Sequence, residues 1–242
     1  VDLRHEGSKR RGAISRPLYR AMQQTLKEDG QVILLLNRRG YSTSIQCPSC
    51  GEVVRCPHCD IALTHHRRAA NESTAEQAVC HYCDYKVVAP DRCSECGFDG
   101  IRYAGLGTQR LEAEVRARFP EAACLRMDSD TMRKVGSHEE ALGRFRAGEV
   151  QILLGTQMIA KGLDFPNVTL VGIINADTAL HFPDFRATER TFQLVTQVAG
   201  RTGRSERGGR VLLQTFSPDH PAISAAVRHD YRRFVSRELP IR

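Results

Sequence analysis

The sequence lacks tryptophan, a membrane-spanning apolar run and a signal-peptide pattern. No stretch approaches the roughly 18 consecutive apolar residues that a transmembrane helix requires, and residues 2–11 are mostly polar or charged. We therefore expect no membrane partner and a cytoplasmic location. Because the first residue is Val1 rather than methionine, we also expect the chain to be a piece of a longer protein.

Two motifs of nucleotide-hydrolysing enzymes are also missing. The sequence contains no Gly-x-x-x-x-Gly-Lys-Ser/Thr phosphate loop and no Asp-Glu box for magnesium. Without them the chain can neither cradle the β- and γ-phosphates of a nucleotide nor hold the metal. We therefore expect this polypeptide alone to hydrolyse no ATP.

Cysteine, by contrast, is concentrated: eight of the nine cysteines lie between residues 47 and 96, in four Cys-x-x-Cys pairs. A Cys-x-x-Cys turn can direct two thiolates at one ion, and structural zinc takes four such ligands in a tetrahedron. A disulfide framework, the main alternative, belongs to short secreted chains. We therefore predict two four-cysteine zinc sites, formed by Cys47/Cys50, Cys56/Cys59, Cys80/Cys83 and Cys93/Cys96.

Four pairs can combine into two sites in three ways, and the sequence leaves all three open. Cys50 and Cys96 are each followed by glycine, which can turn with positive φ and point amides at sulfur, whereas Cys59 and Cys83 are each followed by aspartate. This difference favours a nested arrangement. Site 1 then contains Cys47, Cys50, Cys93 and Cys96, and site 2 contains Cys56, Cys59, Cys80 and Cys83. Four nearby histidines could replace a cysteine, but the ligand count is complete without them: His58, His65, His66 and His81.

The formal net charge of +7 is weak evidence for a nucleic-acid partner. Eight thiolates and two Zn²⁺ together would lower it to about +3. Any nucleic-acid binding must therefore come from the placement of individual arginines.

Outside the cysteine-rich stretch, short apolar runs alternate with helical patterns. The runs predict strands at 32–36, 124–127, 151–155, 168–174 and 211–214, and the patterns predict helices at 17–28, 108–119, from 137, 188–199 and 221–239. We expect Thr108 and Ser137 to cap their helices. The alternation predicts an α/β fold with a parallel sheet covered on both faces. We divide the chain into an arm or linker at 1–16, an α/β lobe at 17–46 and 97–242, and an inserted zinc module at 47–96.

Two segments combine residue types that bind phosphate, and binding residues of parallel sheets gather beyond the carboxyl ends of the strands. The first, residues 197–204, reads Gln-Val-Ala-Gly-Arg-Thr-Gly-Arg, and its guanidinium groups can bind phosphate oxygens bidentately. The second, residues 155–166, reads Gly-Thr-Gln-Met-Ile-Ala-Lys-Gly-Leu-Asp-Phe-Pro and follows a predicted buried strand. Its hydroxyl and backbone amides could hold a phosphate, and Asp164 could accept from a ribose hydroxyl. A solvated loop would explain the arginine segment equally well if it stood alone.

Together these motifs resemble those of superfamily-two helicases. The arginine segment is similar to the last signature motif of that superfamily, and residues 155–166 are similar to the preceding one. Leu-Leu-Leu-Asn-Arg-Arg-Gly-Tyr at 34–41, followed by four Cys-x-x-Cys pairs, resembles the primosomal N-prime family of bacterial replication-restart DNA helicases. The match includes residues 105–108 and 128–131 and extends over nearly the whole chain.

The resemblance implies that the chain is the second RecA-like motor lobe of an ATP-dependent helicase, with the zinc module inserted after its first strand. Arg201 and Arg204 would approach the nucleotide phosphates, one as the arginine finger that stabilises charge during transfer. Gln197 would help to place the nucleotide or the attacking water. Gly162 and Asp164 would contact the nucleotide sugar or the motif arginines.

The resemblance also implies a DNA track on the same lobe. Thr156 would bond a DNA backbone phosphate, and Arg38 and Arg39 would line the path of the DNA. The family usually has glutamate where this sequence has Gln109, which leaves the role of that turn open. Aromatic candidates for a strand-separating wedge are few, namely Tyr82, Tyr85 and Phe98, and we expect them to support the small core of the module instead.

For the complete protein, the resemblance implies two Zn²⁺, ATP and Mg²⁺ as cofactors and 3′-to-5′ travel on branched or forked DNA at stalled replication forks. Expected partners are the N-terminal helicase lobe of the same protein, the single-stranded DNA-binding protein and the primosome components. The alternative is a non-catalytic zinc module that docks DNA or partners, with the α/β lobe as its scaffold.

Overall fold

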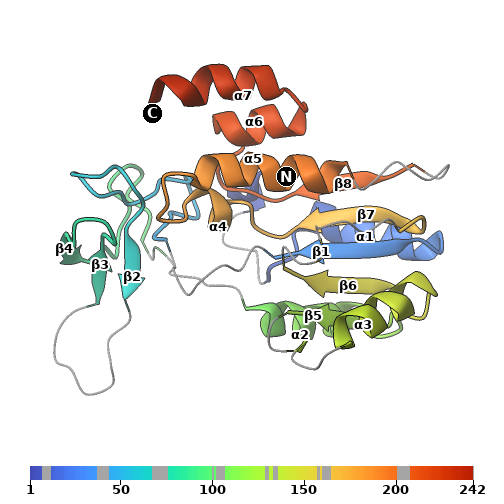
Figure 1. The fold of residues 1–242 in the computed structure, drawn as a ribbon. Helices are drawn as coiled ribbons and strands as arrows, with labels where there is room; N and C mark the ends of the chain where they lie inside the picture. Colours follow the sequence, from blue (N-terminus) through green and yellow to red (C-terminus); the bar gives the residue numbers. More distant parts are fainter. Residues whose placement is uncertain are drawn as a thin grey trace.

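A computed structural model shows a five-stranded sheet with helices on both faces and a smaller three-stranded sheet beside it (Figure 1). The structure describes residues 1–6, 12–36, 44–66, 76–99, 101, 107–128, 131–132, 136–156, 159, 165–200 and 208–241. Among these residues, no helix is both long enough and apolar enough to cross a membrane.

The large sheet is parallel throughout and has the strand order β5-β6-β1-β7-β8. Its strands are β1 (Gln31–Leu35), β5 (Cys124–Met127), β6 (Ile152–Gly155), β7 (Val168–Ile173) and β8 (Arg210–Leu213). All five residues of β1 are buried because the strand lies at the centre, between β6 and β7. The five predicted strands are therefore all present, each within one residue of its predicted start and end.

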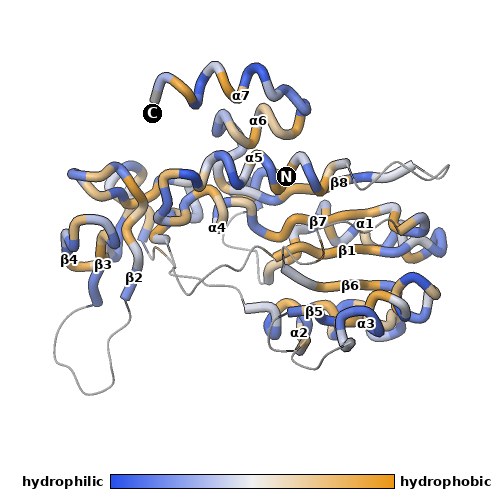
Figure 2. The backbone as a smooth tube through the Cα atoms, in the orientation of Figure 1, coloured by the Kyte–Doolittle hydropathy of each residue, from blue (hydrophilic) through white to orange (hydrophobic). Residues whose placement is uncertain are grey.

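The two faces of the sheet have separate apolar cores. Val32 and Leu34 of β1 belong to a cluster with residues of α1 (Arg16–Lys27) and α2 (Thr108–Arg118). Ile33 and Leu35 belong to the opposite cluster, with residues of α3 (Ser137–Arg146) and α5 (Ala187–Ala199). Alternate side chains of a strand point to opposite faces, so β1 contributes side chains to the apolar cores on both faces of the sheet. Figure 2 shows β1, β6 and β7 as largely apolar strands in the middle of the lobe.

The described residues also form three further helices and two 3-10 helices. They are η1 (Leu3–Glu6), α4 (Asp177–Leu180), α6 (Pro221–Val227), α7 (Tyr231–Glu238) and η2 (Leu239–Ile241). α7 packs back on α5, where the rings of Phe192 and Phe234 are stacked with centroids 4.3 Å apart. The predicted class, a parallel α/β sheet covered on both faces with a small inserted module, is confirmed.

Three predictions about helix ends were wrong. Thr108 does not cap α2, because its hydroxyl donates to Asp128 at 2.6 Å and Gly107 holds the cap position. Ser137 is already inside α3, and Gly136, with a φ of 84°, precedes it. The single closing helix is two helices, because His229 adopts a φ of 54° and stops the first of them.

Residues 1–16, expected to be an arm or linker, lie against the lobe where they are described. The Leu3 amide donates to the Thr215 carbonyl at 2.9 Å, beyond the end of β8. Ala13 and Ile14 are buried in the cluster beneath α1, and the Ser15 side chain caps that helix. These contacts hold the described parts of the segment on the edge of the sheet.

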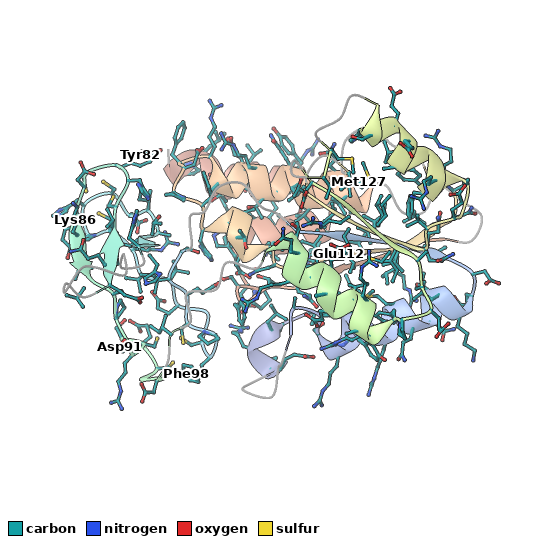
Figure 3. All side chains as sticks on the ribbon, turned by 90° about the horizontal axis from the view of Figure 1, so that it is seen from below. Tyr82, Lys86, Asp91, Phe98, Glu112 and Met127 are labelled. Atoms are coloured by element: carbon teal, nitrogen blue, oxygen red, sulfur yellow. The ribbon has the colours of Figure 1, made fainter. Side chains whose placement is uncertain are left out.

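The small antiparallel sheet contains β2 (Thr64–His66), β3 (Gln77–Val79) and β4 (Lys86–Val88). The core of the module combines four buried cysteines with five small or aliphatic residues, and Tyr85 and Phe98 pack against it. Tyr82 is instead exposed. Figure 3 shows Tyr82, Lys86, Asp91 and Phe98 in this module, well separated from Glu112 and Met127 of the α/β lobe.

Candidate metal centres and motor motifs

The eight cysteines of the module form two separate tetrads. Within each tetrad all sulfur atoms lie within 4.8 Å of one another. The first contains Cys47, Cys50, Cys93 and Cys96, and the second contains Cys56, Cys59, Cys80 and Cys83. Of the three combinations that the sequence allowed, the geometry has the nested one.

The sulfur separations fit a tetrahedral zinc ion. Cys47 Sγ lies 3.7 Å from Cys96 Sγ, and Cys50 Sγ lies 3.6 Å from Cys93 Sγ. In site 2, Cys56 Sγ lies 3.6 Å from a sulfur of the opposite pair, that of Cys83. A tetrahedron with Zn–S bonds of about 2.3 Å has edges of about 3.8 Å, whereas a disulfide would bring two sulfurs to about 2.05 Å. The donor set and its spacing therefore suit two structural zinc ions.

One backbone turn, repeated four times, builds both tetrads. In each Cys-x-x-Cys pair, the amide of the residue after the second cysteine donates to the carbonyl of the first cysteine at 3.0 Å. That residue has positive φ in all four turns: Gly51, Asp60, Asp84 and Gly97. Aspartate tolerates this left-handed conformation better than most residues. The glycine and aspartate turns thus share one conformation, so the difference that we used to favour nesting has no conformational basis.

Backbone amides point at sulfur, as expected for thiolate ligands. The amides of Ser49, His58 and Tyr82 donate to the first cysteine of their turns at 3.4–3.5 Å. Such bonds favour the charged form of the thiol. The histidines lie outside both tetrads: His65 contacts Glu76 at 2.9 Å, and His66 faces His81 at 3.4 Å.

The thiol pKa values diverge within each tetrad. The backbone amide of Phe98 lowers the pKa of Cys96 to about 7, whereas burial raises that of Cys50 to about 12. In site 2, burial of Cys80 is outweighed by backbone amides, so its pKa falls to about 7, while the contact with Cys83 raises that of Cys59 to about 12. Metal binding must displace the more tightly held protons, so it weakens as the pH falls.

The two sequence segments around residues 108 and 128 come together at the carboxyl end of β5. The Thr108 hydroxyl donates to Asp128, and the Thr131 amide also donates to this carboxylate at 3.0 Å. Arg126 lies 3.3 Å from it. Although burial opposes ionisation, these contacts lower the pKa of Asp128 below its usual range. Gln109 is exposed one residue into α2.

Thr156 follows the carboxyl end of β6, where a phosphate-binding residue was expected. The Ile159 amide donates to the Thr156 carbonyl at 3.1 Å. A side chain at Gly155 would clash with Ile159 and lie 2.8 Å from the Met127 carbonyl. Thr156 itself is half-buried at the edge of the sheet, directly after this crowded glycine.

Gln197 does not lie at the edge of the sheet formed by the carboxyl ends of the strands. It is exposed in the last turn of α5, and the chain described next, from Gly208, leads into β8. Since β8 is parallel to the other strands, Gln197 lies toward their amino ends and Thr156 toward their carboxyl ends. The expectation that candidate binding residues gather at one edge does not hold for Gln197. Six other candidates lie outside the described residues: Arg38, Arg39, Gly162, Asp164, Arg201 and Arg204.

A polar cluster around Asp177, after β7, was missed from the sequence. Asp177 is 1% exposed, and it accepts from the Thr215 hydroxyl at 3.0 Å and the Phe216 amide at 2.8 Å. Although burial disfavours the charged carboxylate, contacts with His181 and the Phe216 amide lower its pKa below the usual range. A carboxylate three residues after the end of a buried apolar run was the available signal.

Residues 106–206 match the helicase conserved C-terminal domain. The chain is 48% identical over 240 residues to replication restart protein PriA of Bacillus subtilis (strain 168), and the alignment covers 99% of the chain. The predicted resemblance to the replication-restart helicases is confirmed. Replication restart protein PriA of Chlamydia pneumoniae is 43% identical over 99% of the chain, and that of Synechocystis sp. is 42% identical over 100%.

The chain spans 29% to 31% of the length of these PriA relatives. Among solved structures, the Pyrococcus furiosus Hef helicase domain is 15% identical, and the match covers 82% of this chain and 25% of that chain. Its TM-score of 0.38 is too low to support an argument.

Proposed function

We propose that this chain is the C-terminal motor lobe and zinc-binding region of an ATP-dependent DNA helicase that acts in replication restart. The observation that carries the proposal is the match to the PriA proteins over nearly the whole chain, including the cysteine-rich insertion. A non-catalytic docking module would not require the helicase C-terminal domain at residues 106–206.

In the complete protein, a second lobe supplies the phosphate loop and the magnesium ligands that this sequence lacks. ATP and Mg²⁺ bind between the lobes and draw them together on one DNA strand, and hydrolysis lets the lobes advance in the 3′-to-5′ direction. Arg201 and Arg204 stabilise the charge on the transferred phosphoryl group. Gln197, Gly162 and Asp164 help to hold the nucleotide.

The DNA-binding part of the proposal involves Thr156, Arg38 and Arg39. A hydroxyl and two guanidinium groups suit the oxygens of a DNA backbone phosphate and carry no sequence information. This is appropriate for an enzyme that acts at stalled forks of any sequence. Branched or forked DNA is therefore the proposed substrate, and single-stranded DNA-binding protein and primosome components are the proposed partners.

The two cysteine tetrads would hold one Zn²⁺ each. Bound zinc would join turns that are up to 49 residues apart in the sequence, as Cys47 and Cys96 are. A module this small has few aliphatic core residues, so the metals would supply most of its stability.

The experiment that tests the motor role is DNA-stimulated ATP hydrolysis by the full-length protein. We expect Arg204→Ala to lower the turnover number at least about 1,000-fold, the range found for arginine fingers. Arg232→Ala, on the exposed side of α7, is the matched control and should leave turnover unchanged. DNA-stimulated ATP turnover that survives Arg204→Ala would favour the docking-module alternative.

A further inference from the structure

Site 1 lies against the α/β lobe through the residue that precedes its first ligand. The side-chain nitrogen of Gln46 donates to the Gly51 carbonyl of its own turn at 3.2 Å. The same nitrogen lies 3.3 Å from Asp177 Oδ1 and 3.2 Å from Ser217 Oγ of the lobe. One amide group therefore connects the Cys47 turn to two elements at the carboxyl edge of the sheet.

The lobe side of this contact is the buried Asp177 cluster. One carboxylate oxygen accepts from Gln46 and the Thr215 hydroxyl, and the other accepts from the Phe216 amide. The carboxylate thus joins α4 to the segment that follows β8. Any displacement of Gln46 removes one of the donors that keep this buried charge in place.

Close backbone packing reinforces the contact. A Cβ atom at Gly51 would lie 2.4 Å from the Phe216 carbonyl oxygen, and Gly51 has a φ of 85°. The first turn of site 1 therefore rests directly on the segment after β8, with no space for a side chain between them. A movement of this turn would therefore displace the backbone at Phe216.

Site 2 is placed differently. Arg55, next to Cys56, lies near enough to His220 of the lobe to affect the pKa of that histidine, but the hydrogen bonds from Arg55 to the Asp60 carbonyl and between His65 and Glu76 join residues of the module to one another. Cys80 and Cys83 of this site lie between β3 and β4, and Figure 1 shows the three-stranded sheet apart from the large sheet.

We propose that Gln46 is a positioning residue that couples metal binding at site 1 to the Asp177 cluster of the motor lobe, whereas metal binding at site 2 leaves that cluster unchanged. Zinc fixes the Cys47 turn, the turn fixes Gln46, and Gln46 helps to hold Asp177 and with it the Phe216 amide. The proposal rests on zinc occupancy, proposed above, and adds that the two sites have different effects on the lobe.

Hydrogen exchange of the Phe216 amide, combined with metal analysis, tests this coupling on the whole chain. Cys93→Ser/Cys96→Ser removes half of site 1 without altering the turn next to Gln46, and Cys80→Ser/Cys83→Ser is the matched change at site 2. We expect two zinc ions in the unaltered chain and one in each variant. Exchange at Phe216 should rise at least about tenfold, or about 1.4 kcal/mol, in the site 1 variant only.

A second variant separates coupling from loss of the fold. Gln46→Met keeps all eight thiols and the length of the side chain, so it should retain both zinc ions and still raise Phe216 exchange. Because coupling between binding free energies is reciprocal, this variant should also lower the zinc affinity of site 1, but not that of site 2, in an equilibrium competition with a chelator. Equal Phe216 exchange in both double variants, or unchanged zinc affinity of site 1 in Gln46→Met, would overturn the coupling. An unaltered chain without zinc would instead overturn the metal centres themselves.

Discussion

Gln214 offers the sharpest stability test of the lobe, because one buried side chain holds three backbone segments together. Its side-chain oxygen accepts from the Ser15 amide at 2.8 Å. Its side-chain nitrogen donates to the Ala13 carbonyl at 2.9 Å and the Ile174 carbonyl at 2.6 Å. The residue is 0% exposed, so water cannot replace any of these bonds without opening the structure.

Gln214→Met keeps the volume of the side chain but removes its hydrogen bonds to three buried backbone groups. Each unsatisfied group costs about 1–3 kcal/mol, and partial relaxation should bring the total to about 3–5 kcal/mol. For a chain of this size, each kcal/mol lowers the melting temperature by about 2–4 °C, so we expect a fall of about 6–20 °C.

Urea denaturation followed by circular dichroism measures this change. The midpoint should fall without a change in slope, which would indicate altered stability rather than altered compactness. Gln23→Met on the exposed side of α1 is the matched control and should change stability by less than about 0.5 kcal/mol. A loss below about 1 kcal/mol for Gln214→Met would show that these bonds are not formed as described.

Two further predictions concern pH and metal. Burial, with the nearby His181 and Arg55, lowers the pKa of His220 to about 4, so the folded chain binds fewer protons than the unfolded one between about pH 6.5 and 4. The free energy of unfolding should therefore fall by up to about 3 kcal/mol as the pH drops through this window. His220→Asn, which can still accept from the Ala222 amide, should flatten that dependence; an unchanged pH profile would refute the assignment. For the metal sites, serine at all four positions of site 1 should leave one zinc per chain by elemental analysis. Serine at Cys47, Cys50, Cys80 and Cys83 should leave none, and the opposite result would refute the nested grouping.

The sheet could be predicted from the sequence because each strand is a short apolar run, as in β7, between polar turns. The ends of the helices could not, because their signals compete. Thr108 has the side chain of a cap, but its hydroxyl bonds Asp128, 20 residues away, and no local pattern reveals that partner. The helix ends at His229 because that residue has a left-handed backbone conformation, and a histidine in the sequence does not predict this conformation.

For the metal centres, the sequence predicted the eight cysteine ligands and their four Cys-x-x-Cys pairs. Their grouping depends on contacts such as Cys47 to Cys96, which only the folded module brings together. The Asp177 cluster depends on contacts over still longer distances, since Gln46 and Asp177 are 131 residues apart. A carboxylate of this kind looks like any surface aspartate until its buried partners are known.

The proposed function makes this chain one of the two lobes of an ATP-dependent helicase. ATP hydrolysis by the chain alone, on forked DNA with Mg²⁺ present, tests it most directly, with the full-length protein as the positive control. We expect DNA-stimulated turnover from the full-length protein and none from the chain. Clear turnover by the chain alone, reproduced after removal of contaminating ATPases, would contradict the account.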